Sequence, residues 1–425
     1  MNAVLNSIDT GLALSAPHVT VYFAKDGEKL DFVTNEGRWT KYERAQVMEA
    51  LETWGAVADL TFAVTRDAED ATFKLTKSPS EHGSLGFMNV PDPAYGAAQG
   101  IAWFNTYHYW GKGLLDAGSY SFTILLHELG HGLGLAHPHD TGNGSGLMPQ
   151  VGDGLGLDQG AYTVMTYNDG WPEAPEGAPG SRAWGWNNGP SAIDIAVVQA
   201  KYGANTTTGA GDSVYVLPSE NTSGTGYRAI WDVGGSDTLV ARGDDDAVID
   251  LRAATLKAEV GGGGWVSHIG GIHGGFTIAH GVVIEGATGG AGNDLLRGNG
   301  AANLLAGRGG ADRLIGSGGR DTLEGGIGRD RLNGGAGADV LDGGAGRDVL
   351  TGGAGRDVFV FAAGGGRDRV TDFGAGDVLD LTGFGLESFD TIETIVLAAG
   401  LRIDLDGAVI VLAGVAELTA DMVLL

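Results

Sequence analysis

The chain has 425 residues, with 77 glycines and no cysteine, and its 53 acidic and 26 basic residues give a formal net charge of −27. This length accommodates two domains with separate cores. The acidity argues against nucleic acid and anionic membrane as partners and favours divalent cations, and without disulfides an extracellular form depends on other stabilisers, such as metal ions.

Neither a cleavable export signal nor a membrane span is predicted. The first 18 residues lack a basic segment and an uninterrupted apolar core. No apolar run reaches the length of about 18 residues that a membrane helix requires.

The first half of the chain alternates strand and helix patterns. Residues 19–24 are rich in β-branched and aromatic types and predict a strand. Thr40 and Glu43 form a capping box that opens a helix with an apolar face, and strands are predicted at 60–64 and 71–76. Residues 78–96 are predicted as loop, and 99–105 as a further strand.

The most specific motif is His127-Glu128-x-x-His131-x-x-Gly134-x-x-His137. On a helix, His127 and His131 lie one turn apart on the same face and can reach one ion. Gly134 suits the left-handed turn that ends a helix and returns His137 as a third ligand. Three imidazoles leave one position for water, as in catalytic zinc sites, and Glu128 is the candidate base. The alternative is a helix with incidental histidines, which the third histidine at this spacing disfavours.

A second motif follows in Tyr162-Thr-Val-Met165-Thr-Tyr167. With the zinc motif it resembles the serralysins, a branch of the metzincin metalloproteases. The resemblance implies that Met165 forms the floor beneath the metal. It also implies that Tyr167 is an additional, movable zinc ligand that later hydrogen-bonds the oxyanion.

The resemblance also implies a substrate-binding edge strand, assigned to Ala102, Trp103 and Phe104. A purely structural role for Trp103 and Phe104 is the alternative. The segment from Asp140 to Gln159 differs from the serralysins, so what it recognises is open.

A domain junction is predicted after the helix at 191–205, which Gly203 caps. The resemblance implies an α+β metzincin catalytic domain, a mixed twisted sheet with helices, over residues 1–203. An all-β parallel β-roll domain follows over residues 204–425.

Eight tandem nonapeptides fill residues 289–360 and match G-G-x-G-x-D-x-U-x, the repeat of a calcium-binding parallel β-helix. Position eight is apolar in every copy, which a flexible Gly-rich linker would not require. Asn303 replaces the position-six aspartate in the second copy and weakens any site there. The predicted calcium-binding residues of the repeats are Gly290, Gly292, Asp294, Gly310, Asp312, Asp321, Gly326, Gly328, Asp330, Gly335, Gly337, Asp339, Gly344, Gly346, Asp348, Gly353, Gly355 and Asp357.

Two further segments resemble parts of serralysins. Upstream of the repeats, an additional calcium loop is predicted from Asp232, Gly234, Gly235 and Asp237, with Glu285 as partner. The terminal residues 421–425 resemble the acidic residue and apolar tail of type I secretion substrates, and a closing strand is the alternative.

Together these features predict a secreted, monomeric zinc endopeptidase with one catalytic zinc and several structural calcium ions. Its expected partners are protein substrates, the type I secretion machinery and a possible proteinaceous inhibitor. The secretion machinery would recognise an uncleaved C-terminal signal and export the protein from the cell. The alternatives are a narrow processing protease and a non-enzymatic RTX calcium-binding protein with a vestigial protease domain. Because carboxylates repel without calcium, the roll is expected to fold only when calcium is bound.

Overall fold

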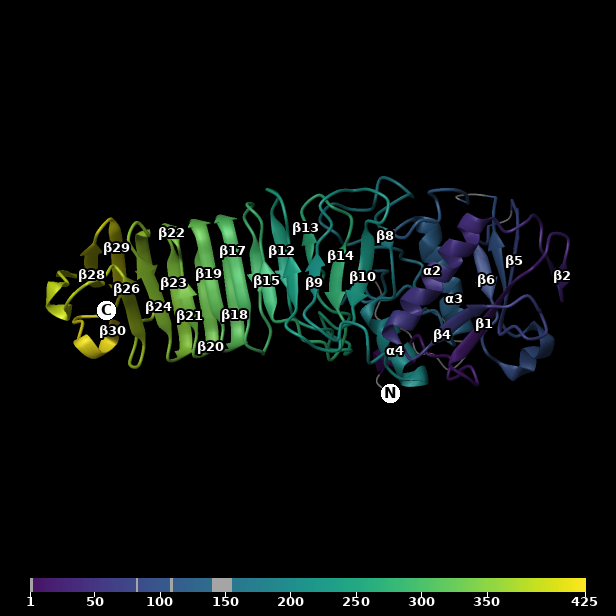
Figure 1. Ribbon diagram of the computed structural model, residues 1–425, viewed down its shortest axis with the longest axis horizontal. Coiled ribbons are helices and arrows are strands. Elements are labelled where there is room, and N and C mark those ends of the chain that lie inside the picture. The colour runs from purple at the N-terminus through teal and green to yellow at the C-terminus, as the bar shows by residue number, and fades with distance from the viewer. Residues whose placement is uncertain (1–2, 82, 108–109, 140–154) are drawn as a thin grey trace.

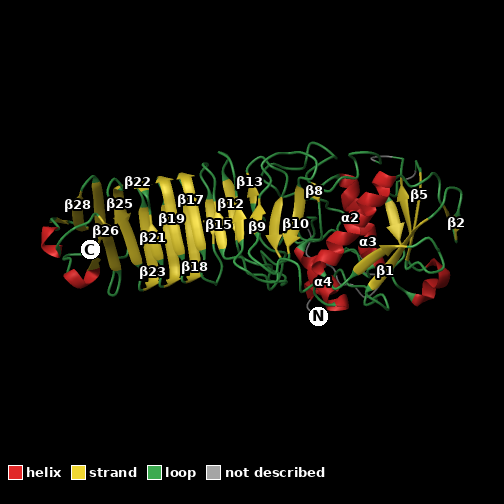
Figure 2. Cartoon of the chain, viewed as in Figure 1, coloured by secondary structure: helices red, strands yellow, loops and turns green. Residues whose placement is uncertain are grey.

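The computed structural model describes residues 3–81, 83–107, 110–139 and 155–425, and it has an elongated shape (Figure 1). The α-helices gather at one end, stacked strands form most of the rest, and short 3-10 helices lie near the C-terminus (Figure 2). The C-terminus lies at the far end of the strand stack. Within the described residues, no helix has both the length and the apolar character needed to cross a bilayer.

The helical end is built on a five-stranded sheet in the order β4-β1-β5-β7-β6. Its strands are β1 (His18–Phe23), β4 (Thr61–Val64), β5 (Phe73–Ser78), β6 (Gly86–Met88) and β7 (Ile101–Asn105). Four strands are parallel, and β6 runs antiparallel to β7. The prediction of a mixed sheet is therefore confirmed.

Two long helices pack together with this sheet. The N-terminus of α2 (Lys41–Val57) carries the predicted capping box, in which Thr40 and Glu43 each accept the other's backbone N–H. α3 (Tyr120–Gly132) carries the histidine motif and has Phe122, Leu125, Leu126 and Leu129 fully buried. The smaller elements here are α1 (Ala3–Asn6), β2 (Lys29–Leu30), β3 (Val33–Thr34) and η1 (Pro93–Ala98).

The edge of the sheet differs from the prediction. Residues 86–88 were expected in a loop, yet they form β6, the outermost strand beside β7. The edge position expected for Ala102, Trp103 and Phe104 is wrong, because β7 is hydrogen-bonded to β5 on one side and β6 on the other. Ala102 and Phe104 are also fully buried, so β6, rather than β7, is the edge strand that lies beside α3.

Strands from both halves of the chain pair in one small sheet. α4 (Ala192–Tyr202) ends at Gly203, whose φ of 87° is the left-handed conformation predicted for its cap. β8 (Trp186–Asn187), before this point, pairs with β10 (Gly226–Ile230), and β10 pairs with β14 (Gly275–Ile278).

The second half is a parallel roll. Its first strands are β9 (Val214–Val216), β11 (Thr238–Val240), β12 (Ala247–Asp250), β13 (His268–Ile269) and β15 (Gly286–Thr288). The repeat strands are β16 (Leu295–Arg297), β17 (Leu304–Gly310), β18 (Arg313–Gly319), β19 (Thr322–Gly328), β20 (Arg331–Gly337), β21 (Val340–Asp342), β22 (Ala345–Gly346), β23 (Val349–Gly355) and β24 (Val358–Ala362). Two repeats form one coil, because Leu305 pairs with Leu323 and Leu314 with Leu332.

Both the core and the turns of the roll depend on the repeat. Every position-eight side chain is at most 1% exposed, so these residues form a continuous apolar column. The position-four glycines allow the coils to stack. A Cβ on Gly328 would lie 1.5 Å from the carbonyl oxygen of Gly310, and one on Gly337 equally close to that of Gly319. No larger residue fits there without separating the coils.

The roll closes with β25 (Gly366–Val370), β26 (Val378–Gly383), β27 (Thr394–Leu397), β28 (Gly400–Leu405), β29 (Ala408–Ala413) and β30 (Val423–Leu424), with η2 (Phe389–Thr391) and η3 (Ala420–Met422) between them. β30 pairs with β26 through Val423 and Leu379. The terminal residues thus form the closing strand considered as an alternative, which leaves the export-signal prediction untested.

Candidate active site

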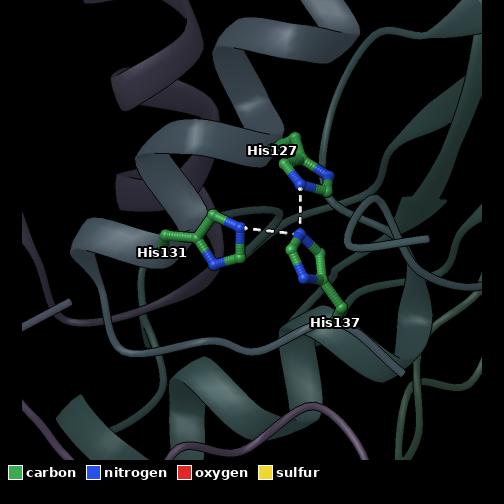
Figure 3. Close-up of side chains that lie close together, drawn as sticks. All are labelled: His127, His131 and His137. Atoms are coloured by element: carbon green, nitrogen blue, oxygen red, sulfur yellow. Dashed lines mark hydrogen bonds between the residues drawn. The ribbon is translucent and has the colours of Figure 1, made fainter. Parts of the chain in front are cut away.

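Three imidazoles meet at the end of α3 (Figure 3). The helix places His127 and His131 on one face, and Gly134, with a φ of 90°, turns the chain so that His137 returns from the opposite side. The Nε2 atom of His137 lies 3.0 Å from the Nε2 atoms of both His127 and His131. Among the described residues, these three form a group able to hold a metal ion.

The surrounding backbone fixes how these rings are protonated. Nδ1 of His127 lies 2.8 Å from the carbonyl oxygen of Val164, and Nδ1 of His131 lies 2.9 Å from that of Leu135. A carbonyl only accepts, so both Nδ1 atoms carry the hydrogen and both Nε2 atoms present lone pairs. Burial, and then the neighbouring His131 and His137, hold the pKa of His127 well below its usual value.

This arrangement fits a metal ion. Two lone pairs face the Nε2 of His137, which has at most one hydrogen to donate and could satisfy only one of them. A cation at the centre satisfies all three nitrogens. A set of three neutral imidazoles with no carboxylate is a donor set typical of zinc.

Glu128 lies beside the first ligand and beneath the edge strand. Its side chain is 7% exposed, and burial raises the pKa of its carboxyl to about 8. Gly86 of β6 packs directly against it, because a Cβ at this position would lie 2.9 Å from Oε1 of Glu128. Sequence analysis missed Gly86, since one glycine in a Gly-rich stretch carries no signal.

A cavity of about 570 Å³ joins these groups. Its lining includes β6, the three histidines, Glu128 and Tyr167. Tyr167 is 66% exposed, and its ring centroid lies 5.7 Å from that of His127 and 4.7 Å from that of His137. His139 is half-buried, and its ring stacks on that of His137 at 4.9 Å between centroids.

Met165 forms the apolar support behind the helix. It is fully buried, and a Cβ on Gly130 would lie 2.7 Å from its sulfur. The glycine inside the histidine motif therefore makes room for Met165.

The turn that contains Met165 is held by Asp194, which sequence analysis did not single out. Asp194 is fully buried at the start of α4 and accepts hydrogen bonds from the Val164 N–H at 2.8 Å and the Thr163 hydroxyl at 2.6 Å. It also accepts the Ser191 N–H at 2.8 Å, and burial raises its pKa to about 7. Since Val164 contacts His127, Asp194 positions that ring indirectly. The available signal was the capping-box spacing of Ser191 and Asp194.

The position-six aspartates of the roll form ladders along its two edges. The backbone N–H of Asp294 donates to Oδ1 of Asp312 at 2.7 Å, and Asp312 donates likewise to Asp330 at 2.8 Å. The other oxygen, Oδ2, is buried without a hydrogen-bond partner in five of these residues, Asp312, Asp321, Asp330, Asp339 and Asp348.

These oxygens face the first glycine of their own repeat. A Cβ on Gly307 would lie 2.3 Å from Oδ2 of Asp312 and 2.7 Å from the carbonyl oxygen of Gly325, one coil later. Gly316 is placed in the same way between Asp321 and Gly334. Carboxylate and carbonyl oxygens around a space kept open by glycine fit calcium. These position-one glycines were absent from the predicted set, which named positions two and four.

Asp294 and Asn303 depart from this pattern, whereas Asp237 follows it. Both carboxylate oxygens of Asp294 accept N–H groups, from Ala247 at 2.7 Å and from Gly290 at 2.6 Å. At Asn303 the amide nitrogen instead donates to the carbonyl of Glu285 at 3.2 Å. Upstream, Asp237 accepts the Ser213 N–H through Oδ1 and keeps a buried, unpartnered Oδ2.

The acidic residues Asp237 and Glu285 of the additional calcium loop lie in contact, and their binding of calcium stays a prediction. The Asp237 N–H donates to Glu285 at 2.9 Å. Burial raises the pKa of Asp237, and the charges of Asp232 and Glu285 raise it further.

The segment from Asp140 to Gln159, whose role was open, falls largely outside the described residues, which resume at residue 155.

The fold and the two candidate metal sites define a class: a metzincin-type domain joined to a parallel β-roll of nonapeptide repeats. In agreement, residues 30–151 match the Matrixin family, and residues 288–323 and 324–359 match the RTX calcium-binding nonapeptide repeat. Zinc and calcium are the cofactors that these matches and the histidine cluster support.

The relatives of this chain are serralysin-type proteins, as the sequence motifs predicted. It is 32% identical to serralysin of Proteus mirabilis over 67% of this chain and 60% of that protein. It is 32% identical to metallopeptidase AprA of Pseudomonas marginalis over 64% of this chain and 57% of that protein. It is 34% identical to serralysin B of Dickeya chrysanthemi over 62% of this chain and 54% of that protein. The chain thus spans about three fifths or less of the length of these relatives.

Proposed function

We propose that this protein is a secreted zinc endopeptidase whose fold is stabilised by calcium. The observation that carries the proposal is the convergence of three Nε2 atoms beside the buried carboxyl of Glu128, inside a cavity bordered by a free strand edge. Residues 1–203 would form the catalytic domain and residues 204–425 the calcium domain.

In the proposed mechanism, His127, His131 and His137 hold zinc, which when bound acidifies water and polarises the scissile carbonyl. Glu128 takes a proton from the attacking water and delivers it to the leaving amine. Tyr167 lies against His127 and His137, and its hydroxyl would donate a hydrogen bond to the developing oxyanion.

The substrate would bind along β6. This strand pairs with β7 on one side only, and its residues Gly86, Phe87 and Met88 line the cavity next to Glu128. An extended peptide can add to such an edge through its main chain, which places a peptide bond near the site without requiring particular side chains.

The roll would bind calcium through the unpartnered carboxylate oxygens of its aspartate ladders and through Asp237. We further propose that the protein acts as a monomer outside the cell, leaves it by type I export with an uncleaved C-terminal signal, and meets a proteinaceous inhibitor. The pairing of β30 within the roll would keep that signal folded until calcium is removed.

The test is cleavage of casein in calcium, with and without a zinc-selective chelator, together with metal analysis. Chelator-sensitive cleavage and about one zinc per chain are expected. Zinc without casein cleavage would favour a narrow processing protease. Absence of zinc would favour a non-enzymatic calcium-binding protein.

A further inference from the structure

One face of the roll carries a hollow of about 720 Å³ with a concentration of basic groups. Six arginines line it: Arg329, Arg331, Arg347, Arg367, Arg369 and Arg402. They are a large share of the 26 basic residues in a chain whose net charge is −27. This set of six is called the arginine hollow below.

The repeat places these side chains in two columns. Position six is a buried aspartate and position eight a buried apolar residue, so positions five and seven of the same strand point outward. Register stacks the coils, because Gly328 pairs with Gly346 and Gly346 with Gly366. Arg329, Arg347 and Arg367, which follow these glycines, therefore succeed one another at about 4.8 Å, the distance between paired strands. In the second column Val349 lies between Arg331 and Arg369, so these two arginines are two strand spacings apart.

The charges of the arginine hollow are mostly uncompensated. Of the ion pairs found among the described residues, one involves this set, between Arg402 and Asp404 at 2.7 Å. The carboxylates that also line the hollow, Asp330, Asp348 and Asp368, are at most 2% exposed and belong to the hydrogen-bonded ladders. Like charges stacked this closely repel one another unless an anion lies between them.

The opposite face of the roll shows that the repeat does not require this pattern. There positions five and seven carry Arg320 and Arg356, which are separated by a coil with Ala338 and Val340 at these positions. The two faces are built by the same nonapeptide, so the run of arginines in consecutive coils on one of them is a property of this sequence.

We propose that the arginine hollow binds an anionic polysaccharide, one with a carboxylate or sulfate group on successive sugars. A step of about 4.8 Å between arginines is close to the length of one pyranose ring, whereas carboxylates on one side of an extended peptide recur at about 6.8 Å. Guanidinium groups bind such oxyanions in a bidentate manner. The remaining wall, formed by Val349, Leu397, Val409 and Val411, offers apolar contact to sugar C–H faces.

The lining argues against nucleic acid as the ligand. Among the described residues that line the hollow, none is aromatic, and single strands are bound largely by stacking on aromatic rings. A surface site for an acidic polysaccharide would hold the protein in a charged extracellular matrix, far from the catalytic cavity at the other end of the molecule.

The test uses the full-length, calcium-loaded protein and a fluorescent heparin octasaccharide, with neutral maltooctaose, poly-glutamate and single-stranded DNA as competitors. Arg331→Gln combined with Arg369→Gln should weaken heparin binding by about tenfold and lower the salt dependence. The matched control, Arg320→Gln with Arg356→Gln, should bind like the wild type. Single substitution Arg367→Gln serves if the double variant does not fold, as judged by its calcium-dependent melting.

Equal loss of binding in the control variant would overturn the proposal, because the effect would then reflect overall charge. So would competition by maltooctaose, or stronger competition by poly-glutamate or DNA than by unlabelled heparin. Absence of heparin binding at low salt would overturn it as well.

Discussion

Replacement of Asp194 tests whether hydrogen bonds to the start of α4 stabilise the turn that contains Met165. In Asp194→Ala, the buried N–H groups of Val164 and Ser191 lose their acceptor, and so does the hydroxyl of Thr163. Each orphaned buried donor costs about 1–3 kcal/mol, partly offset because the costly burial of a carboxyl is removed. We expect a net loss of about 3 kcal/mol, or a fall of about 6–12 °C in the melting temperature of a domain of this size.

The same substitution should weaken metal binding, although Asp194 does not touch the histidines. The carbonyl of Val164 orients His127, and losing a partner of this kind costs about 10–100-fold in metal affinity. Calorimetry and zinc titration against a competing chelator measure the two effects.

Asp194→Asn is the control that separates hydrogen bonding from charge. Its carbonyl oxygen can keep both N–H groups, and its amide can donate to the hydroxyl of Thr163, so stability should stay within about 1 kcal/mol of wild type. Wild-type stability and zinc affinity in Asp194→Ala would refute this account. An equal defect in the Asn variant would mean that the charge matters rather than the hydrogen bonds.

Three further predictions concern the edge strand and the roll. Gly86→Ala places a Cβ 2.9 Å from Oε1 of Glu128 and displaces that carboxyl, so casein cleavage should fall by about 100-fold with zinc still bound. Undiminished cleavage would contradict the close packing of β6 against Glu128. The second prediction concerns the roll in excess chelator. Burial raises the pKa of the carboxyls of Asp312 and Asp368 to about 7, above the value of about 3.9 in unfolded chains. The folded roll then binds more protons than the unfolded chain, so its stability should be greatest below about pH 4 and be lost as pH rises through about 7. Circular-dichroism melts across this range check the sign, and calcium should restore stability at neutral pH. Asn303→Asp replaces an amide that donates to the carbonyl of Glu285 by a carboxylate, so the variant should melt at a lower temperature than the wild type in chelator. Calcium should then stabilise the variant more than it stabilises the wild type. Identical melting temperatures would count against this prediction.

The sequence predicted those parts of the site that depend on local spacing. Histidines at fixed offsets on one helix, and a glycine with positive φ at its end, follow from chain geometry alone, as Gly134 illustrates. The roll is equally local, because each coil repeats its neighbour and one nonapeptide specifies core, turn and aspartate ladder.

Features that depend on contacts between distant segments could not be predicted. β6 has three residues in a loop-like stretch, and it becomes a strand only through pairing with β7. Gly86 and Asp194 act through Glu128 and Val164, which lie 42 and 30 residues away in sequence. The N-terminal segment is similar, since Thr10 pairs with Gly134 beside the site, through a 2.6 Å hydrogen bond from its hydroxyl.

The most direct test of the proposed peptidase is Glu128→Gln, assayed for casein cleavage and zinc content beside the wild type. The amide has the shape of the carboxyl but cannot take a proton from water. The wild type should cleave casein, and the variant should bind zinc equally while its turnover is abolished. Cleavage by the variant at the wild-type rate would contradict the role of Glu128.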